Sequence, residues 1–90
     1  MPSKYDNTFV TMMTGYYDVI DECERSEWIE NTLCNSQEFA KEAMSYLKIE
    51  ISSDFPELLL QAIMDAVFWD NVLQDVRDYV AKNPRAGLND

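Results

Sequence analysis

Apolar residues recur along the chain with the period of an α-helix. In the first quarter of the sequence they are spaced four, three, four and three residues apart, at Phe9, Met13, Tyr16, Ile20 and Cys23. Such spacing places them on one helical face, so the pattern predicts a helix from Thr8 to Glu24 and a buried Cys23. The β-branched residues between 8 and 13 would also suit a strand, but they lack the alternation of apolar and polar positions that a half-buried strand has.

Two shorter helices are predicted from cap residues that precede apolar stripes. Ser26 is a good helix cap and precedes a helix over residues 27–34. Asn35 and Glu38, three residues apart, match the capping-box pattern and open a third helix that continues to about Leu47. Because the connections are short, neighbouring helices are expected to pack antiparallel.

The last helical region is the most apolar part of the chain. Pro56 is tolerated in a first helical turn. Over Pro56–Trp69 apolar residues cover most sides of the helix, so this segment is expected at the centre of the core. A bend or a restart of the helix is predicted near Asp70–Asn71, followed by an amphipathic stretch over residues 72–80.

These elements predict an all-α fold, a compact bundle of four to five helices. The 90 residues weigh 10.5 kDa and make one domain, with mobile ends over 1–6 and 83–90. Surface scaling for this mass buries about 64% of the surface of the unfolded chain, enough for one modest core. The residues expected in that core are Phe9, Met13, Ile20, Phe39, Ala43, Leu47, Leu59, Ile63, Ala66, Val67, Leu73 and Val76.

Charge and composition exclude several functions. Seven basic residues stand against 17 acidic ones, so the net charge is −10 and direct binding to DNA or RNA is not expected. The chain has no histidine and no glycine-rich phosphate loop, so we expect no enzyme, no catalytic residues, no metal site and no cofactor.

The cysteines and the apolar windows indicate a cytoplasmic protein. Cys23 and Cys34 form no Cys-x-x-Cys motif, and no signal-peptide pattern precedes them, which favours reduced thiols in the cytoplasm. The most apolar window, residues 58–69, is too short and too polar for a bilayer span, which needs about 20 apolar residues. No membrane association is therefore expected.

Six carboxylates within thirteen residues form the candidate partner-binding surface: Asp18, Asp21, Glu22, Glu24, Glu27 and Glu30. Only Arg25 offsets them, and several lie near a predicted helix C-terminus, where the macrodipole disfavours negative charge. This placement indicates a surface for a basic partner, with solubility as the alternative explanation. Tyr17 lies off the apolar stripe and beside these acids, so it is the candidate aromatic anchor.

The chain opens with Tyr5-Asp6-Asn7-Thr8-Phe9 and is small, acidic and helical in pattern. In these features it resembles the small phage proteins that block host restriction enzymes by mimicking DNA, and the wider anti-CRISPR class. The resemblance implies an inhibitor in the host cytoplasm that docks its negative surface onto a basic nucleic-acid-binding complex. The alternative is a self-associating helical adaptor or structural module, because a homodimer would bury the surplus apolar residues of the last helical region.

Overall fold

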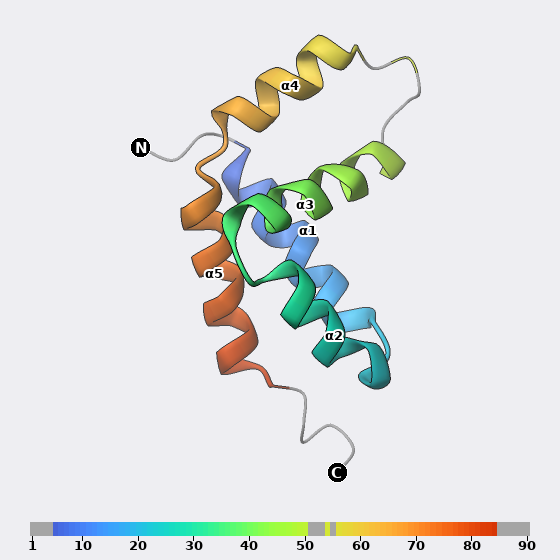
Figure 1. Ribbon diagram of the computed structural model, residues 1–90, viewed down its shortest axis with the longest axis vertical. Coiled ribbons are helices and arrows are strands. Elements are labelled where there is room, and N and C mark those ends of the chain that lie inside the picture. The colour runs from blue at the N-terminus through green and yellow to red at the C-terminus, as the bar shows by residue number, and fades with distance from the viewer. Residues whose placement is uncertain (1–4, 51–53, 55, 85–90) are drawn as a thin grey trace.

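The computed structural model describes residues 5–50, 54 and 56–84, with the side chain of Glu50 excepted, and these residues form helices without any strand (Figure 1). The helices within those ranges are α1 (Asp6–Val19), α2 (Glu22–Thr32), α3 (Ser36–Glu50), α4 (Glu57–Ala66) and α5 (Trp69–Lys82). The predicted all-α bundle is therefore confirmed, and the stretch between 8 and 13 is helical rather than extended.

The centre of the bundle is the pair α1 and α5, which share the most extensive helix–helix contact, with α3 packed against both. Figure 1 shows α5 running alongside α1 and α4 lying across one end of the molecule. The largest fully buried side chains come from α1, α3 and α5 and are Phe9, Met13, Tyr17, Phe39, Val72 and Val76. The core is therefore built mainly on these three helices.

The prediction that Pro56–Trp69 is the central helix is wrong. The helical part, α4, buries only Leu60 and Ile63. Two of the expected core residues, Leu59 and Ala66, are exposed, while Leu47 is half-buried. The apolar pattern covers most sides of this helix, so it could not indicate which side would find neighbours, and only one side did.

The first predicted helix is in fact two helices. Ile20 and Asp21 adopt extended backbone, with ψ of 155° and 147°, so α1 ends at Val19 and α2 begins at Glu22. Cys23 therefore lies on a different helix from the apolar stripe, and it is exposed rather than buried. Ser26, the predicted cap, lies inside α2.

Asp6 and Asn83, near the two ends of the described chain, make hydrogen bonds with the rest of the bundle. Asp6 is buried at the start of α1, and its Oδ1 accepts a hydrogen bond of 3.3 Å from the backbone N–H of Phe68. The carbonyl of Asn83 accepts a hydrogen bond of 2.7 Å from the Tyr17 hydroxyl. Asp6 and Asn83 therefore both contact the bundle; the mobility of the ends stays a prediction, and residues 1–4 and 85–90 lie outside the described residues.

The cap of α3 and the restart of the helix near Asp70–Asn71 are both confirmed, the break itself lying a few residues earlier. The N–H of Glu38 donates to Asn35 Oδ1 at 2.8 Å, as a capping box requires. The chain breaks at Val67 and Phe68, whereas Asp70–Asn71 lies within the first turn of α5. An acidic residue there is favoured by the helix dipole, so Asp70 stabilises the helix start rather than a bend.

Candidate functional site

All six predicted acidic residues are exposed, but they do not form one face. Asp18 is held by α5, because its carboxylate accepts the hydrogen bond of the Tyr79 hydroxyl, whose oxygen lies 3.0 and 2.8 Å from the two carboxylate oxygens. The other five lie before or on α2. Asp18 therefore has a structural role that the sequence pattern did not indicate.

The energetic interpretation of the cluster needs correction. Asp21 occupies the N-cap position of α2, and Glu22 and Glu24 lie in its first turn. Negative charge is favoured at a helix N-terminus, so these acids stabilise α2 rather than oppose it. Their clustering alone is therefore no argument for a function.

The predicted aromatic anchor, Tyr17, is part of the core. It is 1% exposed, and its ring packs edge-on against Tyr79 with centroids 6.1 Å apart. Arg25, the one cation within the acidic cluster, is buried with its guanidinium 5.8 Å from the centre of the Tyr17 ring. Arg25 thus faces inward, and the acids around it keep their negative field toward solvent.

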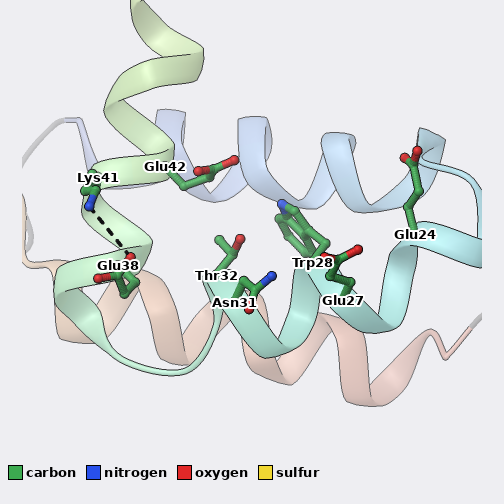
Figure 2. Close-up of a pocket in the computed structure, with 8 residues that line it drawn as sticks. All are labelled: Glu24, Glu27, Trp28, Asn31, Thr32, Glu38, Lys41 and Glu42. Carbon is green, nitrogen blue, oxygen red and sulfur yellow. Dashed lines mark ion pairs between the residues drawn. The ribbon is translucent and has the colours of Figure 1, made fainter.

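A cleft of about 380 Å³ between α2 and α3 gathers acidic residues from both helices (Figure 2). Its lining residues are Glu24, Glu27, Trp28, Asn31 and Thr32 of α2, and Glu38, Lys41 and Glu42 of α3. We call this site the α2–α3 cleft. Four carboxylates and one ammonium line it, a net charge of −3. Glu24 and Glu27 come from the predicted cluster, whereas Asp21, Glu22 and Glu30 do not line the cleft.

One carboxylate of the cleft is held in position by a chain of hydrogen bonds. Trp28 Nε1 donates to the Tyr46 hydroxyl at 3.0 Å, and this hydroxyl donates to Glu42 Oε2 at 2.8 Å. Burial, and then the hydrogen bond to Glu42, raise the pKa of Tyr46, so the hydroxyl remains a donor at neutral pH. Tyr16 stacks on Tyr46, with ring centroids 4.6 Å apart. These contacts orient Glu42.

Thr32 provides a hydroxyl on the opposite helix that opens onto the cleft. The residue is 4% exposed, lies in the last turn of α2 and lines the cleft. Its hydroxyl makes no hydrogen bond to any described residue, in contrast to Thr14, whose hydroxyl donates to the carbonyl of Val10 at 2.8 Å. Figure 2 shows the Thr32 side chain in the space between the two helices. The cleft therefore contains a polar group with unused hydrogen-bonding capacity.

The ion pair between Lys41 and Glu38, at 4.0 Å, is the one salt bridge among the described residues. Both side chains are substantially exposed, so the pair contributes little to stability. No three acidic or sulfur-bearing side chains in the described ranges are placed to hold a metal ion. Figure 2 shows Glu24 and Glu38 near opposite ends of the cleft, so its negative charge is spread along its length.

Sequence reasoning missed Glu38 and Glu42 as site residues. Glu38 was expected only as a helix-capping residue, and no role was predicted for Glu42. Their spacing of four residues places them on one side of α3, as the spacing of three places Glu24 and Glu27 on one side of α2. The two pairs were visible in the sequence, but their meeting across a cleft was not.

A second surface is apolar. A groove of about 570 Å³ between α1 and α3 is lined by Thr11, Met12, Gly15, Tyr16, Val19, Tyr46 and Ile49. Val19 and Ile49 are largely exposed at this groove. A Cβ added at Gly15 would meet no atom within 4 Å, so the packing of the bundle does not require glycine there. No helix among the described residues is long and apolar enough to cross a membrane.

By fold and charge the chain is a small acidic helical-bundle protein with a carboxylate-lined cleft. Comparison with protein-family models, with curated proteins and with solved structures finds no match in any of the three. Function must therefore be inferred from the residues of the chain itself.

Proposed function

We propose that the protein is a binding protein rather than an enzyme, and that it docks an acidic surface onto a basic nucleic-acid-binding protein. One observation carries the proposal: two pairs of glutamates, from α2 and from α3, border the same cleft, and Lys41 is the one basic residue that lines it among the described residues. Like charges that line one cleft repel each other, and a basic partner would relieve that repulsion. The negative field would also accelerate the encounter with such a partner.

The class of partner follows from charge. A protein that binds nucleic acid presents lysine and arginine side chains to phosphates. Carboxylates on neighbouring helices can form ion pairs with those same lysine and arginine side chains. The Tyr5-Asp6-Asn7-Thr8-Phe9 opening adds the resemblance to phage counter-defence proteins. We therefore propose a restriction or CRISPR complex in the host cytoplasm as the partner, inhibited by occupation of its DNA-binding surface.

A charge-reversal experiment tests this proposal. Changing Asp21, Glu24 and Glu27 to Lys adds three increments of +2 and raises the net charge from −10 to −4. We expect the affinity for the captured partner to fall at least about tenfold, which is about 1.4 kcal/mol. The matched control changes three exposed acids on α4 and α5 to Lys, Asp65, Asp75 and Asp78, and reaches the same net charge.

Partners would be captured from host lysate, identified by mass spectrometry, and measured as purified proteins across a salt series. Equal loss of affinity in both charge-reversed variants would show that total charge, not the α2 surface, governs binding. Capture of proteins that do not bind nucleic acid, with affinity independent of salt, would contradict the proposal altogether.

Self-association is the second candidate function, and the exposed side of α4 favours it. Leu58 is 85% exposed and the adjacent Leu59 is 49% exposed, and Phe68, between α4 and α5, is also exposed. Two copies could bury these residues in an isologous dimer. Sedimentation at micromolar concentration tests this function: a dimer that Leu58→Glu dissociates supports it, and a monomeric wild-type protein contradicts it.

A further inference from the structure

We propose that the α2–α3 cleft binds an arginine side chain of the partner. The inference rests on the proposed function, because it names the group of the basic partner that this acidic site receives. It is carried by the shape and charge of the cleft, by an oriented carboxylate, and by the hydroxyl of Thr32, a residue only 4% exposed, which opens onto the cleft without a hydrogen-bond partner among the described residues.

The distribution of charge suits an elongated organic cation. Glu24 and Glu38 lie near opposite ends of the cleft in Figure 2, and Glu42 lies between them. The volume of about 380 Å³ is within the range of pockets that hold small organic groups. Lys41 is largely exposed and pairs with Glu38 at the rim, so it leaves the interior of the cleft open to a guest cation.

Two acceptors from different helices are ready for hydrogen bonds to such a guest. Glu42 uses Oε2 to accept from Tyr46, and its other carboxylate oxygen has no partner among the described residues. Thr32 is only 4% exposed, and its hydroxyl opens onto the cleft and makes no hydrogen bond within the described ranges. A donor that enters the cleft would replace water at this hydroxyl and bond it and the Glu42 carboxylate together.

Arginine meets these requirements better than lysine. A guanidinium group is planar, presents five N–H donors in a fixed fork, and can donate to a carboxylate and a hydroxyl at the same time. It is also less strongly hydrated than an ammonium group, so it loses less on entering a cleft. The methylene groups of its stem can pack on the apolar wall that Trp28 provides.

The test uses N-acetyl-arginine amide as the probe, with N-acetyl-lysine amide and N-acetyl-citrulline amide as matched controls. Binding is followed by NMR on the indole N–H of Trp28. The indole of Trp69 is the internal reference, because it donates to the carbonyl of Met64, away from the cleft. We expect a saturable shift at Trp28 with a millimolar dissociation constant, at least about threefold weaker binding of the lysine probe, and no shift at Trp69.

Variants separate the site from general electrostatics. Thr32→Val and Glu42→Gln should each weaken the arginine probe at least about threefold, while Thr32→Ser, which keeps the hydroxyl, should not. Glu30→Gln removes an acid of α2 outside the cleft and should leave the affinity unchanged. If circular dichroism shows that either cleft variant folds poorly, the three probes on the wild-type protein still decide whether the cleft prefers arginine.

The absence of a saturable shift at Trp28, equal binding of the arginine and lysine probes, or unchanged affinity in both Thr32→Val and Glu42→Gln would overturn the assignment. If the partner is still lost on reversal of Asp21, Glu24 and Glu27 while the probe leaves Trp28 unshifted, the proposed function stands and only the arginine site fails. If the probe binds but no basic partner is captured, the site stands and the proposed function fails.

Discussion

Adjacent residues in this small bundle differ sharply in environment. Leu59 and Leu60 follow each other on α4, yet Leu59 is 49% exposed and Leu60 only 6%. One residue turns a helix by about 100°, which is enough to move a side chain from the core to solvent. The identity of the buried leucine therefore depends on how α4 is rotated against its neighbours.

The different burial of Leu59 and Leu60 predicts different losses of stability when each is changed to alanine. Leu60→Ala should lower the free energy of unfolding by about 2–5 kcal/mol, because it leaves a cavity in the core. Leu59→Ala should cost about 1 kcal/mol or less, because half of the side chain is already in water. Urea unfolding followed by circular dichroism measures both. Equal losses in the two variants would mean that α4 is rotated differently from the structure.

The Tyr46 hydroxyl, which lies between Trp28 and Glu42, gives a second prediction about a single residue. Tyr46→Phe leaves the indole N–H of Trp28 without its acceptor, so we expect a loss of about 1–3 kcal/mol in the free energy of unfolding. Tyr79→Phe removes a hydroxyl that donates to the exposed Asp18 carboxylate, which water can solvate in its place, and it should cost less. A larger loss for Tyr79→Phe in the same urea titrations would contradict the role given to Tyr46.

At the scale of elements, the break between α1 and α2 decides what the acidic residues do. With Ile20 and Asp21 extended, Glu22 lies in the first turn of α2 and Glu30 in its last turn. The helix dipole favours the charge of the first and disfavours that of the second. Acids that appear equivalent in the sequence therefore have opposite effects on the same helix.

Neutralising these two residues separately tests that account. Glu22→Gln and Glu30→Gln each change the net charge from −10 to −9, so any difference between them excludes the effect of total charge. We expect Glu22→Gln to be less stable than Glu30→Gln by about 0.3–1 kcal/mol at low ionic strength, and the difference to shrink in 1 M NaCl. Identical unfolding curves at low salt would argue against the dipole.

The whole molecule carries a net charge of −10 on a bundle whose radius of gyration is 13.6 Å. Self-repulsion on that scale opposes folding, and salt screens it. The same negative charges attract a basic partner, and salt screens that attraction as well. Salt should therefore stabilise the free protein and weaken the proposed complex.

Thermal unfolding measures the first half of this prediction. Raising NaCl from about 0.01 M, where the screening length is about 30 Å, to about 0.15 M, where it is about 8 Å, should raise the melting temperature. The variant with Asp21, Glu24 and Glu27 changed to Lys should show a smaller rise, because its net charge is −4. An equal rise in both proteins would assign the salt effect to causes other than net charge.

The sequence alone was sufficient for the class of fold and for part of its detail. The helical spacing of apolar residues predicted an all-α bundle, and the predicted Asn35 cap of α3, which accepts from the Glu38 N–H, is present in the structure. Ten of the twelve residues expected in the core are buried or half-buried, Leu59 and Ala66 being the exceptions. These features follow from interactions between residues three or four positions apart, which a sequence pattern contains directly.

Tertiary structure decided the rest. It ended α1 at Val19, placed α4 at one end of the bundle, and buried Tyr17. It also brought Glu24 and Glu27 to the same cleft as two glutamates of α3. Each of these outcomes depends on which helix faces meet, and that is settled by side-chain packing between segments far apart in the chain. Local periodicity states which side of a helix is apolar; only the packing of all five helices determines what that side contacts.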